Sequence, residues 1–194
     1  MTPTEILLLV ASVLDSLGVP HAVVGSMASS AWGFPRSTND ADIVAELDSP
    51  HVTALVEALG RDFYVDAEAI ERAIRTGRSF NAIHRLSAFK VDVFVPPRGG
   101  FGLQQIARRR LERIGPAPDG PLLAVTAPED AILGKLEWFA KAGSVSDRQW
   151  RDVVGVMTVQ RERLDVAYLR QWAARLGLLP LLERALTDAG LAGI

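Results

Sequence analysis

The chain has 194 residues, of which 48% are hydrophobic and 23% charged, a composition typical of one globular domain or of a compact core with a short appendage. Its 21 basic and 23 acidic residues give a formal charge of -2, so no overall charge drives it toward nucleic acid or an anionic membrane. It has no cysteine, which excludes disulfides, thiolate catalysis, iron–sulfur clusters and cysteine-based zinc sites.

The first predicted helix begins with the capping box of Thr2 and Glu5 and ends near Gly18. Acidic Glu5 and Asp15 bracket its apolar stretch, and no basic region or cleavage site accompanies it, so we expect no signal peptide. No segment approaches the ~20 apolar residues that span a bilayer. We therefore expect a cytoplasmic protein without a membrane-spanning segment.

The next part of the chain predicts alternating strands and helices. Apolar or alternating runs between turn-forming residues predict strands at 22–24, 40–46, 63–65, 79–86 and 89–95. Helical patterns predict helices at 27–32, 49–59, 67–75 and 101–113. The strand at 40–46 is expected beside the first strand, and the last two strands are expected to form a hairpin in the same sheet.

A segment rich in proline and glycine, Gly115 to Pro121, is the predicted domain boundary. Residues 1–115 predict a core in which a mixed β-sheet is flanked by helices. Residues 121–194 carry capping boxes and helical patterns, including helices at 166–176 and 181–189, and predict a helical bundle. The predicted fold class is therefore α+β.

Asp40-Ala41-Asp42 at the start of a predicted strand is the sharpest chemical feature. Side chains two positions apart in a strand point to the same face, with α-carbons roughly 7 Å apart, so both carboxylates can reach one divalent ion. Ligands that are all oxygen favour Mg²⁺ or Mn²⁺ over zinc. The alternative is that Asp40 caps a turn and Asp42 is a solvated strand residue.

Asp92 is the one acid in an otherwise apolar strand, Lys90 to Val95. Burial penalises such a carboxylate unless it is paired, bound to metal or at a sheet edge. If its strand neighbours the one that begins at Asp40, the third carboxylate joins the first two, as catalysis by two metal ions requires. The alternatives are an edge position or a salt bridge to Lys90 or Arg85.

Gly25 and Ser26 end the first predicted strand in a tight turn. The glycine allows close backbone approach, the following helix presents free N–H groups to a phosphate, and Ser26 adds a hydroxyl donor. A Gly-Ser pair also occurs in simple turns, and neither a Walker loop nor a G-x-G-x-x-G accompanies this one.

Together these residues resemble the DNA polymerase β-like nucleotidyltransferase superfamily: Val23-Val24-Gly25-Ser26, then Asp40-Ala41-Asp42, then Asp92 on a later strand. Arg36-Ser37-Thr38-Asn39 followed by the paired aspartates is similar to the R-x-S/T-x-D-x-D of AbiE-type toxins and related bacterial nucleotidyltransferases. The resemblance covers residues 20 to 95 and implies a nucleotidyltransferase core.

The resemblance also implies site residues. Asp40, Asp42 and Asp92 would be catalytic and would bind Mg²⁺ or Mn²⁺, with Asp92 also acting as a base. Gly25 and Ser26 would hold the nucleotide triphosphate. Arg36 would contact phosphate, or would instead pair with a carboxylate of its own loop.

Two residues of the helical part also resemble later motifs of the toxin-like group: Lys135, and Asp152 in Arg151-Asp152. There the lysine contacts phosphate and the aspartate supports catalysis. This chain has Arg-Asp where that group often has Lys-Asp. By spacing alone, Asp152 and Arg148 would form an i,i+4 surface pair, and Lys135 would lie on an ordinary polar face.

The basic run Arg108-Arg109-Arg110, with Arg113 on the same predicted helix, is the strongest basic cluster. It predicts either contact with a nucleic-acid backbone or a solvated face balanced by Glu112.

The predicted function is transfer of an NMP from an NTP to an acceptor hydroxyl with release of pyrophosphate. The acceptor is left open among tRNA or another RNA, a protein and a small molecule, and the resemblance implies a cognate antitoxin or toxin partner. Two alternatives are kept: a non-catalytic nucleotide-binding or antitoxin-like module of the same fold, and a metal-dependent phosphodiester hydrolase.

Overall fold

A computed structural model describes residues 1–114 and 120–193 of the chain. It divides into two compact units: the first contains Met1–Val24 and Ser37–Thr126, and the second contains Gly25–Arg36 and Ala127–Ile194. The predicted domain boundary is Gly115 to Pro121, and its residues 115–119 lie outside the described residues. The chain therefore leaves the first unit after Val24 and re-enters it at Ser37.

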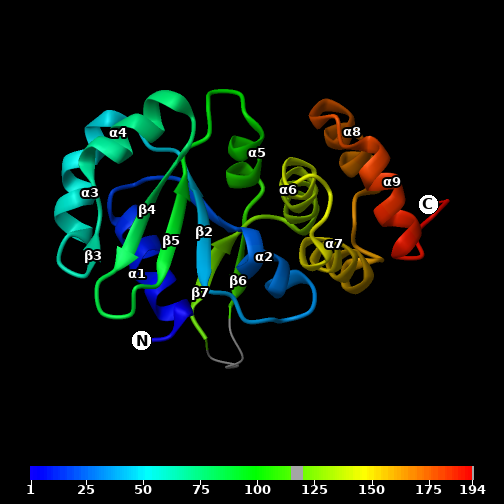
Figure 1. Ribbon diagram of the computed structural model, residues 1–194, viewed down its shortest axis with the longest axis horizontal. Helices are drawn as coiled ribbons and strands as arrows, with labels where there is room; N and C mark the ends of the chain where they lie inside the picture. Colours follow the sequence, from blue (N-terminus) through cyan, green and yellow to red (C-terminus); the bar gives the residue numbers. More distant parts are fainter. Residues whose placement is uncertain (115–119, 194) are drawn as a thin grey trace. The chain divides into compact units, whose positions relative to one another are not determined.

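The first unit is built on a seven-stranded mixed sheet of order β3-β4-β5-β2-β1-β7-β6, which confirms the α+β class (Figure 1). The strands are β1 (His21–Val24), β2 (Asp40–Ala45), β3 (Phe63–Tyr64), β4 (Ser79–His84), β5 (Lys90–Phe94), β6 (Arg110–Arg113) and β7 (Leu122–Val125). β1 is antiparallel to β2 and parallel to β7, and β2 is parallel to β5. The predicted hairpin is β4–β5, which is antiparallel.

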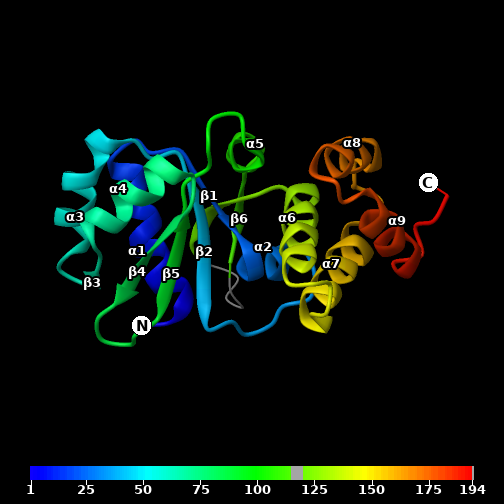
Figure 2. The ribbon, with the colours of Figure 1, turned by 45° about the horizontal axis from the view of Figure 1, so that its top comes forward.

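The two faces of this sheet are covered by different helices (Figure 2). The helices α1 (Pro3–Ser16), α3 (Val52–Leu59) and α4 (Ala67–Thr76) lie on one side, and α5 (Phe101–Ala107) on the other. On the α5 side, Ile106 and Leu103 pack against Val24, Val44 and Phe94. Because β2 alternates, Val44 shares this face with Asp40 and Asp42, so one face changes from apolar to acidic along a single strand.

Two predictions about the sheet edge are wrong. The helix predicted at 101–113 ends at Ala107, and Arg110 to Arg113 form strand β6, which pairs with the unpredicted strand β7. Arg109, Arg110 and Arg113 therefore do not share one side of a helix. The pairing of β6 with β7 outweighs the helical pattern of this part of the chain. A reading of the local sequence alone does not detect such a pairing.

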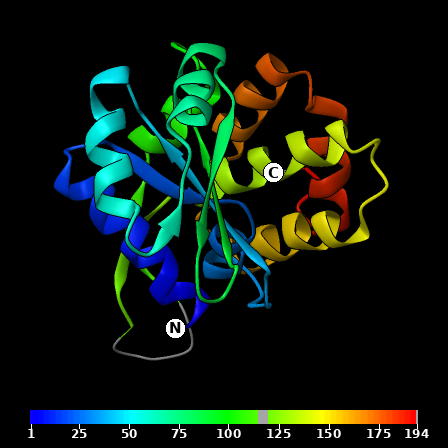
Figure 3. The same ribbon diagram turned by 60° about the vertical axis from the view of Figure 1, so that its left-hand side comes forward.

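The second unit is helical (Figure 3). It contains α2 (Gly25–Trp32) together with α6 (Pro128–Lys141), α7 (Asp147–Gln160), α8 (Val166–Leu176) and α9 (Leu179–Asp188). Its core includes Ile132, Leu133 and Leu136 of α6, none of which is exposed. The described residues contain no helix that is both long and apolar enough to cross a membrane.

Candidate functional site

Three aspartates of the first unit lie on one face of adjacent strands; we call Asp40, Asp42 and Asp92 the acidic cluster. Asp42 in β2 and Asp92 in β5 are Cα partners in the parallel pairing, and Asp40 lies two residues before Asp42. Partners on adjacent strands lie about 5 Å apart, with their side chains on the same face. β5 is an interior strand, so the alternative that Asp92 lies at a sheet edge is wrong.

Asp92 already has two partners in the first unit. Lys90 Nζ lies 2.7 Å from Asp92 Oδ2, and the Asn81 side-chain amide donates to Asp92 Oδ1. The hydrogen bond to Asp92 raises the pKa of Lys90 against the opposing effect of burial, and the charges of Asp40 and Asp42 act in the same direction as the bond. The salt bridge that the sequence left as an alternative is therefore present.

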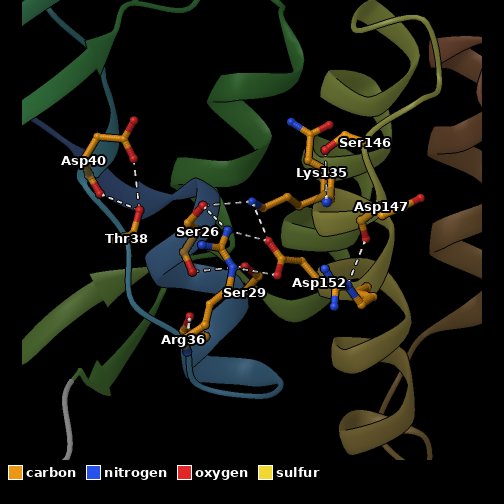
Figure 4. A network of polar contacts seen from close by, with 12 residues as sticks. Ser26, Ser29, Arg36, Thr38, Asp40, Lys135, Ser146, Asp147 and Asp152 are labelled. Carbon is orange, nitrogen blue, oxygen red and sulfur yellow. Dashed lines mark hydrogen bonds and ion pairs between the residues drawn. The ribbon is translucent and has the colours of Figure 1, made fainter.

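Asp40 is held by its own loop. Thr38 Oγ1 donates toward the main-chain oxygen and Oδ1 of Asp40, each at 3.0 Å. Figure 4 shows this local turn, which fixes the residue that begins β2. The threonine of the Arg36-Ser37-Thr38 sequence therefore has a structural role in orienting the first carboxylate.

The acidic cluster fits a divalent metal by residue type and register, since all its donors are carboxylate oxygens on one face of neighbouring strands. Its side chains are arranged around other partners, however. Within residues 1–114 and 120–193, no group of three or more His, Asp or Glu side chains is positioned to hold a metal ion.

A second polar cluster lies within the second unit (Figure 4); we call Ser26, Arg36, Lys135 and Asp152 the cation network. Arg36 binds Asp152 in a bidentate manner, with Nε 2.9 Å from Oδ1 and Nη2 2.8 Å from Oδ2. Lys135 Nζ lies 2.9 Å from the same Oδ2. Both cations also donate to Ser26 Oγ, Arg36 at 2.7 Å and Lys135 at 3.1 Å.

The cation network is largely buried. The side chains of Lys135 and Asp152 are each 8% exposed, and that of Arg36 is 24% exposed. Burial favours the neutral acid and would raise the pKa of Asp152, but the hydrogen bond from Arg36 and the charge of Lys135 outweigh it and lower the pKa of this carboxyl. Asp152 is therefore an anion shared by two cations at neutral pH.

This arrangement decides the alternatives that spacing left open. Arg36 pairs with Asp152, which follows it by 116 residues. Lys135 is buried and does not belong to an ordinary polar face. Asp152 is largely buried and has its partners Arg36 on the loop after α2 and Lys135 on α6, so it does not form a simple surface pair with Arg148.

Two glycines allow the loop after α2 to pack directly against α7. A Cβ on Gly33 would lie 2.9 Å from Val156 N and 3.0 Å from Ser29 O, both backbone atoms. A Cβ on Gly155 would lie 3.0 Å from Cδ2 of Phe34. Glycine at both positions allows the close approach that brings Arg36, farther along the loop, to Asp152 on α7.

Gly25 and Ser26 begin α2. Gly25 has φ +63, in the left-handed region that glycine adopts without strain, and it follows Val24 directly. Val24 is the Cα partner of Asp42, so the chain passes from the strand beside the acidic cluster to a residue of the cation network within two positions. Ser26 is fixed in turn by Ser29, whose Oγ donates to the Ser26 carbonyl at 3.0 Å.

Sequence reasoning missed Asn81 as a partner of Asp92. In the structure the antiparallel register of β4 and β5 places Asn81 opposite Asp92, whereas the predicted strands 79–86 and 89–95, joined by a two-residue turn, would place Ile83 there. A single amide opposite a single acid in two apolar strands indicates a hydrogen-bonded pair.

Comparison with known proteins gives structural but not sequence relatives. No family model matches the sequence, and no curated protein matches it. Crystalline ANT(2")-Ia in complex with adenylyl-2"-tobramycin is similar at a TM-score of 0.57 and 12% identity, over 91% of this chain and 97% of that one. An antigenic nucleotidyltransferase-like protein from Paracoccidioides brasiliensis is similar at a TM-score of 0.55 and 18% identity. The similarity covers 95% of this chain and 91% of that one. Lincomycin-bound LnuA, a lincosamide antibiotic adenylyltransferase, is similar at 0.50 and 11%, over 82% and 98%.

The chain therefore has the nucleotidyltransferase fold, as the resemblance of its sequence implied. Each similarity extends over most of both chains, so it includes helical and sheet parts alike. The closer likeness to AbiE-type toxins stays a prediction.

Proposed function

We propose that this protein is a nucleotidyltransferase that moves an NMP from an NTP to an acceptor hydroxyl. The observation that carries the proposal is the register of β2 and β5, which places Asp92 opposite Asp42 on the face that also bears Asp40. A fold shared with known nucleotidyltransferases supports it. The acceptor oxygen attacks the α-phosphorus in line, the bond to the bridging oxygen breaks, and pyrophosphate leaves.

In this proposal Asp40, Asp42 and Asp92 hold Mg²⁺ or Mn²⁺ through carboxylate oxygens. A bound divalent ion supplies charge stabilisation at the phosphoryl oxygens and lowers the pKa of a bound hydroxyl. Asp92 is also the group that accepts the proton of the acceptor hydroxyl. Thr38 keeps Asp40 oriented toward the same face.

The cation network binds the triphosphate in this proposal. Arg36 and Lys135 bring two cations together there, and both can also contact an anionic ligand. Ser26 adds a hydroxyl, and Gly25 and the first turn of α2 add backbone N–H groups. Lys135 and Arg36 would contact the phosphates, and Asp152, held by three hydrogen bonds, would keep both cations in place rather than transfer a proton.

The acceptor is proposed as an RNA end, a protein hydroxyl or a small molecule. Small molecules are the first class to test, because one similar protein is in complex with adenylyl-2"-tobramycin and another is a lincosamide adenylyltransferase with bound lincomycin. The likeness of Arg36 to Asp42 to AbiE-type toxins instead favours a protein or RNA acceptor and a cognate antitoxin.

The testing experiment incubates the protein with Mg²⁺ or Mn²⁺ and each α-labelled NTP in turn. Aminoglycosides, a lincosamide, total tRNA and lysate protein serve as acceptors in separate reactions. We expect label on one acceptor class and release of pyrophosphate, both lost in Asp92→Ala. Release of labelled NMP without a labelled acceptor would indicate the hydrolase, and NTP binding without any product would indicate a binding module.

A further inference from the structure

We propose that Lys90 is the resident counter-ion of the acidic cluster, and that its ammonium must leave Asp92 before a divalent cation binds there. This inference rests on the proposed function, because it concerns the same three carboxylates. It assigns Lys90 a positioning role: it holds the cluster together without metal and sets how tightly metal binds.

The position of Lys90 follows from strand register. Lys90 is the Cα partner of Asp40 across the β2–β5 pair and lies two residues before Asp92 on β5. Its side chain therefore shares the face of all three carboxylates. Its ammonium is placed on Asp92 Oδ2 at 2.7 Å.

Electrostatics explains why a cation is needed at this point. Three carboxylates on neighbouring positions of one sheet face repel one another, and the ammonium of Lys90 offsets part of that repulsion. A divalent cation on the same oxygens offsets more of it. The ammonium and the metal cannot occupy the same lone pairs of Asp92 Oδ2, so the two compete.

Exposure indicates that the exchange is feasible without moving the sheet. The side chain of Lys90 is 41% exposed, whereas that of Asp92 is 15% exposed. The lysine has a long flexible stem and can turn into solvent, while Asp92 stays fixed at its other oxygen by the Asn81 amide. Lysine departure would then free Oδ2 for a ligand without disturbing the strand pairing.

The first test measures Mn²⁺ affinity without nucleotide, by the loss of the free-ion signal in electron paramagnetic resonance. We expect Lys90→Gln to bind Mn²⁺ about tenfold more tightly than the natural protein, and Lys90→Arg, which keeps a cation, to remain within about twofold of it. Without metal, Lys90→Gln should also melt at a lower temperature and gain more from added Mn²⁺. Lys141→Gln is the matched control, since its Glu137 pair at 2.9 Å lies on an exposed part of α6.

Unchanged or weaker Mn²⁺ binding in Lys90→Gln would overturn the counter-ion role, and if Asp42→Asn abolished binding in the same series the metal site itself would stand. Absence of Mn²⁺ binding in both the natural protein and Lys90→Gln would overturn both proposals. Binding that emerges only in Lys90→Gln would support the counter-ion role.

A second measurement uses the natural sequence, so it does not depend on a variant folding. Lysine labelled with ¹³C at Cε gives a resonance for Lys90, assigned by its absence in Lys90→Arg. Saturation with Mg²⁺ should shift this resonance and leave that of Lys141 in place. A Lys90 resonance that does not move at saturating Mg²⁺ would refute displacement.

Discussion

The acidic cluster and the cation network have opposite charges at their centres, and the cation that pairs with the acidic cluster is more exposed than the cations of the network. In the first, three carboxylates face one ammonium, and Lys90 is 41% exposed. In the second, two cations share one carboxylate, and Lys135 and Asp152 are each 8% exposed. Acids predominate among the named residues of one cluster, and cations predominate among those of the other.

This difference in charge and exposure indicates what each cluster can do. Buried charges must be paired, so the cation network is held by its own hydrogen bonds and contributes to folding of the second unit. In the acidic cluster, the cation that pairs with Asp92 is the partly exposed Lys90, which can be exchanged for another cation. By charge, the acidic cluster suits a divalent cation, and the cation network suits an anionic group.

The largest expected effect is a loss of nucleotidyl transfer without a loss of stability. Asp42→Asn keeps the shape of the side chain and removes one charge from the acidic cluster, so we expect nucleotidyl transfer to fall by at least about 10³-fold. The thermal midpoint should stay the same or rise, because repulsion within the cluster decreases. Initial rates with labelled NTP and a melting curve test both, and a variant that remains active would contradict the metal assignment.

The opposite pattern is expected in the cation network. Asp152→Ala leaves Arg36 and Lys135 without their shared carboxylate, and we expect a loss of about 2–4 kcal/mol in the free energy of unfolding. Tryptophan fluorescence in urea reports on this unit alone, since all four tryptophans (Trp32, Trp138, Trp150 and Trp172) belong to it.

Two controls accompany this measurement. Adding Lys135→Met to Asp152→Ala removes one of the unpaired cations and should recover part of the loss. Arg170→Ala breaks an ion pair of similar length, 2.8 Å to Glu183, but on the exposed surface, and should leave the urea midpoint unchanged. An equal effect of Arg170→Ala and Asp152→Ala would contradict the importance of burial.

Dependence on pH sharpens the same comparison. The pKa of Asp152 is lowered from its ordinary value of 3.8, so the stability that its charge contributes is fully present above about pH 4 and is lost as the pH falls through the lowered pKa. We expect the difference in unfolding free energy between the natural protein and Asp152→Asn to be constant from pH 7 to about 4 and to shrink below it. A difference that shrinks already near neutral pH would contradict this assignment.

The acidic cluster could be predicted because its signal is local. Asp40 and Asp42 lie two residues apart in one strand, and Asp92 is the one acid in an apolar run, so alternation and burial alone single them out. The resemblance to a superfamily then joined the two strands, and the register of β2 and β5 agrees with it.

The partners inside the cation network could not be predicted in the same way. Arg36 meets Asp152 across 116 residues of chain, and Lys135 meets Ser26 across 109, so nothing in local spacing links them. The resemblance named these residues one by one without saying that they bind each other. The same limit explains part of the failure to predict β7, because one of its two neighbours in the sheet, β1, lies far from it in the sequence.

The smallest expected effect compares the two glycines that seat the loop on α7. Gly33→Ala directs its new Cβ at backbone atoms, 2.9 Å from Val156 N, which cannot move without shifting α7, and we expect a loss of about 1–3 kcal/mol. Gly155→Ala meets only the Phe34 ring, which is 65% exposed and can turn away, and alanine favours the helix by about 1 kcal/mol over glycine.

The two alanine variants should therefore differ in sign. Gly155→Ala is expected to be neutral or slightly stabilising in urea unfolding, while Gly33→Ala should also weaken NTP binding, because it moves the loop that carries Arg36 away from Asp152. Equal and small effects of both substitutions would mean that the loop is not held against α7 and that the position of Arg36 depends on its salt bridge alone.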